Sequence, residues 1–215
     1  VISKERYARS QGNISFDKLK NEIQIQKSLN HPNIVQSKYS FSDDFYYYIV
    51  LEYCPGKSVQ DLLFKKEEGH LTEPETRKIL NDIIQGLIYI QNHQIIHHDL
   101  KLDNFLIGSD GEVKIADFGL ATYMQYSNQK QLSVCGTTNY LSPELLRFGG
   151  ANNHGFEVDI WAIGVATFIM LTGRAPFDGG SKEMTFENIK KCIYHFPSKS
   201  GLSYDAKDFI ESIFQ

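Results

Sequence analysis

The stretch His97-His98-Asp99-Leu100-Lys101-Leu102-Asp103-Asn104 decides how this chain of 215 residues is interpreted. It places an aspartate, a lysine two residues later and an asparagine five residues later in one short segment. Phosphoryl transfer needs such groups: a carboxylate that orients and deprotonates the attacking hydroxyl, a cation that neutralises the moving phosphoryl group, and an oxygen that holds a metal ion. The stretch therefore predicts a phosphoryl-transfer site.

Two further motifs follow, Asp117-Phe118-Gly119 and Ser142-Pro143-Glu144. Asp117 supplies a second carboxylate, which suits Mg²⁺ because this hard cation prefers oxygen ligands and keeps several waters. An isolated His-x-Asp or Asp-Phe-Gly is a weak signal, but the three motifs in this order and at these distances form a specific one.

Composition is that of an ordinary globular protein, with 41% hydrophobic and 22% charged residues. The length fits one or two domains. A net charge of -4 gives no electrostatic argument for a nucleic-acid or membrane partner. Three cysteines without metal-ligand or disulfide spacing favour a reducing compartment. No signal peptide is visible and the longest apolar run, residues 160–171, is too short to cross a bilayer, so we expect an intracellular protein of the cytoplasm or nucleus.

The first part of the chain reads as strands with one helix. Residues 1–3 predict the end of a strand, and the polar residues 5–15 predict a loop. From Phe16 the apolar residues recur at helical spacing until His31-Pro32 stops the helix.

An antiparallel hairpin should follow this helix. Aromatic and β-branched runs at residues 34–41 and 45–51 flank Ser42-Asp43-Asp44, which has turn chemistry. Pro55-Gly56 then breaks the pattern, which places a hinge near residues 52–57.

The rest of the chain is mainly helical. Thr72-Glu73-Pro74-Glu75 predicts a helix that begins with a capping box. Residues 105–107 and 113–115 predict two short strands, residues 117–144 a long, mostly polar loop, and helix predominates from Phe156 onward. This order favours an α+β fold over a doubly wound α/β sheet.

The motifs and this layout together resemble the eukaryotic protein kinases over nearly the whole chain, residues 1–215. The segments Asn139-Tyr140-Leu141-Ser142-Pro143-Glu144 and His154-Gly155-Phe156-Glu157-Val158-Asp159-Ile160-Trp161 are most similar to the polo-like serine/threonine kinases. The resemblance implies a bilobal protein kinase-like fold. Residues 1–54 would form a partial N-lobe that ends in the hinge, and residues 55–215 a C-lobe truncated at its C-terminus.

By this resemblance, Asp99 is the catalytic base, Lys101 contacts the γ-phosphate of ATP, and Thr137 bonds both side chains. Asn104 and Asp117 are the ligands of Mg²⁺, with Asp117 also bound to the nucleotide through the metal. Lys101 in this loop favours serine/threonine over tyrosine specificity.

The resemblance also assigns the nucleotide pocket. Glu22 would pair with the phosphate-binding lysine, although a glutamate on a charged helix face is commonly solvated. The backbone from Glu52 to Cys54 would bond adenine, with Leu51 as the gatekeeper and Leu106 as the floor of the site. A thiol at Cys54 would be open to alkylation if it is exposed.

Two positions concern the shape and control of the catalytic loop. Asp159 matches a buried aspartate that braces this loop, and Ser133 falls where polo-like kinases carry an activating phosphothreonine, although a plain serine of a polar loop is the alternative. His98 replaces the arginine that grips such a phosphate, and imidazole lacks the planar fork of a guanidinium. We therefore expect phosphorylation of Ser133 to activate weakly or in a pH-dependent way.

Both ends depart from the family pattern. No G-x-G-x-x-G precedes the first helix. Val1-Ile2-Ser3-Lys4 superficially matches the V-A-I-K pattern, but Lys4 can also be a second lysine, in which case the phosphate-binding one would precede Val1. At the other end, the sequence stops at Gln215, before the arginine that in the family normally pairs with the glutamate at Glu144. We expect a piece of a longer kinase, with further domains or flanking segments.

Three functions follow as hypotheses. The first is an ATP- and Mg²⁺-dependent protein serine/threonine kinase that acts on protein substrates. The second is a pseudokinase or catalytically incomplete fragment that acts as a binding module, which the missing glycine-rich loop favours. The third is a small-molecule phosphotransferase, which Gly136-Thr137 and Ser142-Pro143-Glu144 disfavour because they build the peptide-docking segment of protein kinases.

Overall fold

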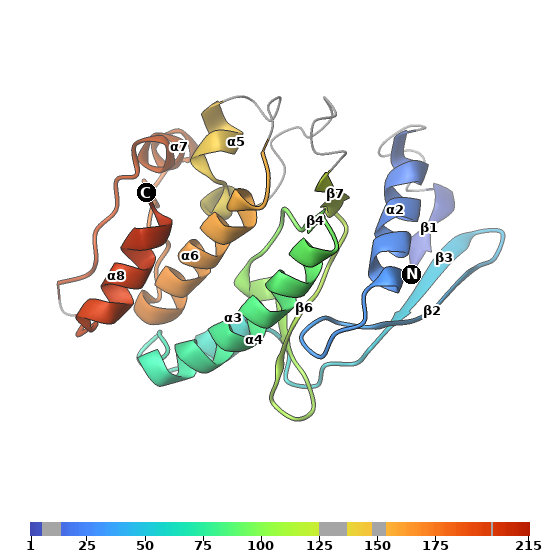
Figure 1. The fold of residues 1–215 in the computed structure, drawn as a ribbon, viewed down its shortest axis with the longest axis horizontal. Coiled ribbons are helices and arrows are strands. Elements are labelled where there is room, and N and C mark those ends of the chain that lie inside the picture. Colours follow the sequence, from blue (N-terminus) through green and yellow to red (C-terminus); the bar gives the residue numbers. More distant parts are fainter. Residues whose placement is uncertain (6–13, 125–136, 148–153, 199) are drawn as a thin grey trace.

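The computed structural model describes residues 1–5, 14–124, 137–147, 154–198 and 200–215, and of residues 14–20 and 147 the backbone alone. Figure 1 shows a small sheet with one helix on one side of the molecule and a larger helical part on the other. The sheet is antiparallel in the order β1-β3-β2. Its strands are β1 (Ile2–Ser3), β2 (Ser37–Ser42) and β3 (Tyr46–Leu51), and the helix beside it is α2 (Ile14–Ser28).

The predicted hairpin is confirmed, and its turn has a local cause. The Asp43 side chain Oδ1 accepts hydrogen bonds from the backbone N–H groups of Phe45 and Tyr46, at 2.8 and 2.7 Å. An aspartate that bonds the backbone two or three residues ahead mimics a turn. The aspartate at this position therefore gives the corner a local cause.

The prediction of a strand from residue 34 was wrong for its first three residues. Ile34 and Val35 are each 1% exposed, but they lie in a loop, and β2 begins only at residue 37. The Val35 N–H donates to the Ile115 carbonyl and the Ile115 N–H donates to the Asn33 carbonyl, both at 2.9 Å. The apolar run is buried because this loop docks on a strand of the larger part, which periodicity cannot reveal.

The larger part holds most of the helices and two small sheets. Both sheets are antiparallel pairs, β4 with β7 and β5 with β6. The strands are β4 (Ile95–Ile96), β5 (Phe105–Ile107), β6 (Val113–Ile115) and β7 (Thr122–Tyr123), with 3₁₀ turns η1 (Leu102–Asn104) and η3 (Thr138–Tyr140). The helices are α3 (Val59–Phe64), α4 (Glu73–Asn92), α5 (Pro143–Arg147), α6 (Glu157–Thr172), α7 (Lys182–Lys191) and α8 (Tyr204–Ile213).

The largest buried apolar cluster includes residues of α4, which packs against α6 on one side and against β6 on the other (Figure 1). The apolar positions of α4 recur at helical spacing and are buried: Ile79, Ile83, Leu87 and Ile90. Helix α6 is apolar on nearly all sides because it is enclosed by other elements, and Gly173 ends it with a left-handed φ of 70°. No helix in the described ranges is both long enough and apolar enough to cross a membrane.

One glycine allows the hinge to approach β5. The Gly56 N–H donates to the Ile107 carbonyl at 3.0 Å, and a Cβ built on Gly56 would lie 2.6 Å from the Ile107 side chain. Only a residue without a side chain fits this crossing. The segment that joins the two parts is therefore held directly against β5.

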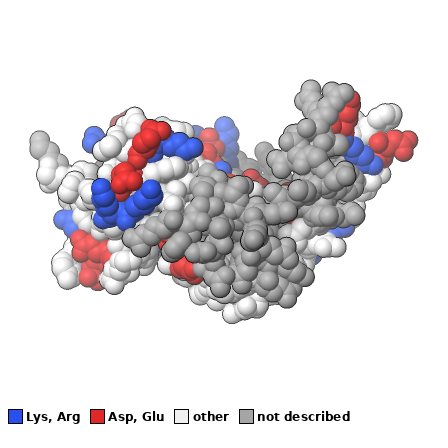
Figure 2. Space-filling view, turned by 90° about the horizontal axis from the view of Figure 1, so that it is seen from above, with Lys and Arg blue, Asp and Glu red and all other residues white. Residues whose placement is uncertain are grey.

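Charges of both signs are intermixed on the face shown in Figure 2, wherever described residues form it. On α7, Glu187 lies 3.3 Å from both Lys190 and Lys191. Exposed pairs of this kind contribute little to stability.

The predicted α+β architecture is confirmed, whereas the division into residues 1–54 and 55–215 remains a prediction.

The capping box of α4 yields a test of the local folding argument. The Thr72 hydroxyl accepts from the Glu75 N–H, and the Glu75 carboxylate accepts from the Thr72 N–H at 2.9 Å. Thr72→Ala should lower the free energy of unfolding by about 1 kcal/mol, because a helix N–H loses its partner. Thr72→Ser keeps the hydroxyl and is the matched control. Equal stability of the alanine and serine variants in chemical denaturation would contradict the argument.

Candidate active site

The catalytic loop predicted at residues 97–104 is held from below by Asp159 of α6. The Asp159 carboxylate accepts hydrogen bonds from the backbone N–H groups of His97 and His98, at 2.8 and 2.9 Å. Asp159 is 1% exposed. Burial raises the pKa of Asp159 to about 7, and the two N–H donors oppose this rise. The brace predicted for this aspartate is thus present in the structure.

Three predicted catalytic side chains meet above this brace. The Lys101 ammonium lies 2.7 Å from Asp99 Oδ2 and 3.1 Å from Thr137 Oγ1. The Asn104 amide donates to the Asp99 carbonyl and carboxylate, at 2.8 and 3.2 Å. Because each side chain touches another, the carboxylate of Asp99 is held in place by a cation and an amide from its own loop.

A cavity of about 280 Å³ opens beside this group, between the two parts of the molecule. Four predicted nucleotide-site residues line it together with Asn104, namely Glu22, Leu51, Leu106 and Asp117. They come from α2, β3, β5 and the segment after β6, so the fold brings together residues that are distant in the sequence. The apolar walls suit an apolar ligand group, and the acidic side chains suit a cation.

Sequence reasoning missed four residues of the same cavity: Gln26, Ile49, Asp103 and Ala116. Ile49 is two residues before Leu51 on one strand, and side chains two apart on a strand share a face. Asp103 and Ala116 directly precede residues that had been predicted. These neighbours could have been found from spacing, but Gln26 depends on how α2 is rotated against the rest.

Two acidic side chains of the cavity lie close to each other, those of Glu22 and Asp117. A Cβ built on Gly119 would lie 3.1 Å from Asp117 Oδ1 and 3.7 Å from Glu22 Oε2. Burial, and then the charge of Asp117, raise the pKa of Glu22. Two carboxylates this close favour a cation between them.

Lys4 lies at the hairpin turn and not between Glu22 and Asp117. Its ammonium donates to the Asp43 carbonyl at the hairpin turn and lies 4.8 Å from the centre of the Tyr47 ring. This geometry disfavours Lys4 as the phosphate-binding lysine. The pairing of Glu22 with such a lysine remains a prediction.

The hinge residues divide between two environments. Leu51 lines the cavity, whereas the carboxylate of Glu52 points to Lys114, 2.9 Å away on β6. The Cys54 side chain is partly buried and does not line the cavity, and burial raises the pKa of its thiol. A raised thiol pKa disfavours alkylation at neutral pH. Contact of adenine with the backbone at residues 52–54 remains a prediction.

His98 is packed rather than available to a phosphate. Its Nε2 lies 2.9 Å from Thr122 Oγ1 of β7, and its ring packs edge-on against His154, with centroids 5.2 Å apart. Burial, and then the neighbouring imidazoles of His154 and His97, lower the pKa of His98 to about 3. The side chain therefore stays neutral near pH 7. Ser133, the candidate phosphosite, lies outside the described residues.

The side chains present fit a bound Mg²⁺. Asn104 donates its amide hydrogens to Asp99, which leaves its carbonyl oxygen for a ligand. One oxygen of Asp117 accepts the Gly119 N–H at 3.2 Å. Within the described part of the chain, no three His, Cys, Asp or Glu side chains form a cluster that could hold a metal by themselves. Mg²⁺ commonly takes only one or two protein ligands and completes its shell with phosphates and water. The two ligands stay a prediction.

Comparison with known proteins agrees with this geometry. The family model described as "Protein kinase domain" matches residues 1–215. "Probable serine/threonine-protein kinase CCRP1" of Zea mays is 41% identical over 91% of this chain and 31% of its own length. "Serine/threonine-protein kinase polo" of Drosophila melanogaster is 44% identical over 85% of this chain and 31% of its own length.

A vertebrate relative shows the same pattern. "Serine/threonine-protein kinase PLK1" of Xenopus laevis is 41% identical over 84% of this chain and 29% of its own length. The chain thus spans about a third of the length of these curated relatives, two of which carry polo-like names. The predicted resemblance is confirmed, and the chain belongs to the protein kinase domain family.

Proposed function

We propose that this protein transfers the γ-phosphoryl group of ATP to serine or threonine hydroxyls of protein substrates. The observation that carries the proposal is the Lys101 ammonium, which lies between Asp99 and Thr137 with Asn104 beside them. A carboxylate, a cation and a metal-binding amide held in mutual contact are the groups that phosphoryl transfer uses. Lys101 and Thr137 also support serine/threonine specificity by their likeness to that class.

The side chains divide the work between proton transfer and charge. The Asp99 carboxylate would orient the substrate hydroxyl and accept its proton. Lys101, held by Asp99 and Thr137, would neutralise charge on the transferred group. Bound Mg·ATP would supply the phosphoryl group and a second cation, held by Asn104 and Asp117. Catalysis then rests on positioning and electrostatics, with no covalent intermediate on the protein.

One observation favours a binding module as the second candidate. The Glu22 and Asp117 carboxylates face each other, and the described Lys4 lies elsewhere. Without a cation between them, triphosphate binding would be opposed by like charge. The four mutually placed groups Asp99, Lys101, Asn104 and Asp117 favour catalysis, because a scaffold has no physical need for all of them.

The assignment of Asp99 as the catalytic base gives the first test of the kinase proposal. Asp99→Asn in the protein at its natural length should lower phosphate transfer to a serine-containing protein substrate by about a thousandfold or more, because the proton acceptor is lost. Binding of Mg·ATP, measured by calorimetry, should change little. Asp44→Asn, an exposed change of the same kind in the hairpin turn, is the control.

Unchanged turnover in Asp99→Asn would remove Asp99 as the base. Binding of Mg·ATP by the unsubstituted protein without transfer would favour the binding module. Absence of Mg·ATP binding would reject the kinase proposal and leave the binding module.

Regulation through Ser133 gives a second test. The neutral, partly buried His98 offers no charge to a phosphate on the activation segment. Ser133→Ala should therefore lower kcat by less than about a hundredfold, measured on protein that has been phosphorylated in cells. Ser109→Ala, an exposed serine of the β5–β6 turn, is the control. A larger loss that is specific to Ser133 would contradict weak activation.

His98 should also make stability depend on pH. A histidine of the unfolded chain has a pKa of about 6.5. Folding lowers the pKa of His98 to about 3. Between these values the unfolded state binds more protons, so acidification below pH 6.5 destabilises the fold. Compared with wild type, His98→Gln should gain about 1–2 kcal/mol in relative unfolding free energy between pH 7 and pH 5. A pH-independent difference in urea denaturation would show that His98 titrates normally.

A further inference from the structure

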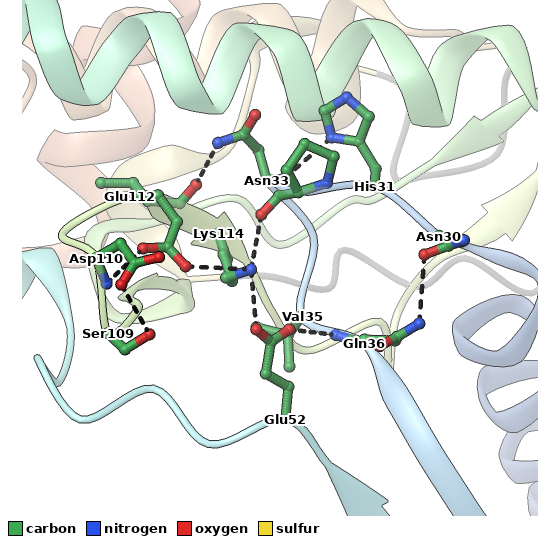
Figure 3. A network of polar contacts seen from close by, with 12 residues as sticks. Asn30, His31, Asn33, Val35, Gln36, Glu52, Ser109, Asp110, Glu112 and Lys114 are labelled. Carbon is green, nitrogen blue, oxygen red and sulfur yellow. Dashed lines mark hydrogen bonds and ion pairs between the residues drawn. The ribbon is translucent and has the colours of Figure 1, made fainter.

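Lys114 of β6 is buried and does not line the cavity. Figure 3 shows its ammonium pointing toward Glu52 of the hinge and toward Glu112. The residue is 7% exposed. Its ammonium donates to the Pro32 carbonyl at 2.8 Å and lies 2.9 Å from Glu52 Oε1 and 3.4 Å from Glu112 Oε1. An ammonium has three N–H groups, so these three oxygens satisfy it completely.

The charges of this group are mutually dependent. Burial by itself lowers the pKa of Lys114, but the bonds to Glu52 and Glu112 outweigh burial and raise it. Burial raises the pKa of Glu52, but Lys114 and the Gln36 N–H outweigh it and lower that pKa. Both partners are therefore ionised near neutral pH. Removal of one partner of a buried pair leaves the other without compensation.

Glu52 is the hinge residue of this group and is held at two points. Its carboxylate Oε2 accepts the Gln36 N–H at 3.1 Å, and its own N–H donates to the Gln36 carbonyl at 2.8 Å. The ion pair with Lys114 fixes the other carboxylate oxygen. Side chain and backbone of the hinge are thus locked to the loop that precedes β2, as Figure 3 shows.

The same loop connects to α2 and to the larger part of the molecule. The Asn33 amide donates to the Val113 carbonyl at 3.0 Å, next to Lys114 on β6. The Gln26 amide of α2 donates to the Val35 carbonyl at 2.6 Å. Gln26 lines the cavity, so one wall of the site depends on where this loop lies.

We propose that Lys114 is a positioning residue for the nucleotide site: its ammonium holds the hinge at Glu52 and the loop after α2 in one arrangement against β6. The cavity walls from α2, the hinge and the β5–β6 pair are then set before a nucleotide enters. A site that is already ordered binds its ligand with a smaller entropy cost. The inference rests on the proposed function, because it assigns the cavity to a nucleotide.

A purely structural role for Lys114 predicts a different result. A structural anchor would change the stability of the whole fold and would affect nucleotide affinity and turnover alike. A positioning residue loosens the hinge locally and raises the ATP requirement more than it lowers the maximal rate. The two roles are therefore separated by local exchange measurements and by comparing KM with kcat.

The test compares Lys114→Met with Lys191→Met, which removes an exposed ammonium of α7 from its pair with Glu187. Amide hydrogen exchange of the free protein, calorimetry with Mg·ATP and steady-state transfer assays are measured on each. In Lys114→Met we expect exchange at the amides of residues 36 and 52 to rise about tenfold, because their opening becomes easier. Kd and KM for Mg·ATP should rise about tenfold and kcat less than threefold. Lys191→Met should match wild type.

A double-mutant cycle assigns the effect to the pair. If Lys114 acts through Glu52, then Lys114→Met combined with Glu52→Gln should be no worse than the more harmful single change. Should Lys114→Met fail to fold, Glu52→Gln alone carries the test, because it leaves Lys114 bound to Glu112 and Pro32.

Unchanged exchange at residues 36 and 52, or equal changes in KM and kcat, would overturn the positioning role. A rise in kcat would overturn it as well, because the network would then hold back turnover. If the unsubstituted protein binds Mg·ATP without transferring phosphate, the kinase proposal fails, and the exchange and affinity measurements still decide the role of Lys114.

Discussion

The arrangement of the candidate site depends on a buried carboxylate, that of Asp159. Asp159 lies at the start of α6, 1% exposed, and accepts the N–H groups of two successive residues of the catalytic loop. A buried carboxylate is tolerated only when its oxygens are bonded, and the loop amides supply those bonds. These two hydrogen bonds join the loop to the start of α6. The positions of Asp99, Lys101 and Asn104 follow from this connection, since they lie within the next six residues.

A second set of contacts joins the walls of the cavity. The hinge and α2 belong to the smaller part of the molecule, whereas Leu106 and Asp117 belong to the larger part. Lys114 and the docked loop at residues 33–35 join these walls through charge-assisted and backbone hydrogen bonds. Bonds to charged groups are stronger than neutral ones. The loop at residues 97–104 is therefore held by Asp159, and the walls of the cavity are joined through Lys114.

Much of the fold could be predicted because its causes are local. The turn at Asp43, the capping box at Thr72 and the strands at residues 105–107 and 113–115 each follow from nearby side chains. The run at residues 34–36 could not be predicted in the same way. Its burial comes from Ile115, some eighty positions later, and an apolar run does not say which neighbour covers it.

The sequence alone determined the chemistry of this protein: which acids, amide and lysine are present, their spacing within one loop, and the family that this pattern resembles. Tertiary structure alone decided which of them meet and in what state. It placed Glu22 against Asp117, turned Glu52 away from the cavity toward Lys114, and packed His98 so that it stays neutral. The physical reason is that charge state and direction depend on burial and on partners distant in the chain, and sequence spacing records neither.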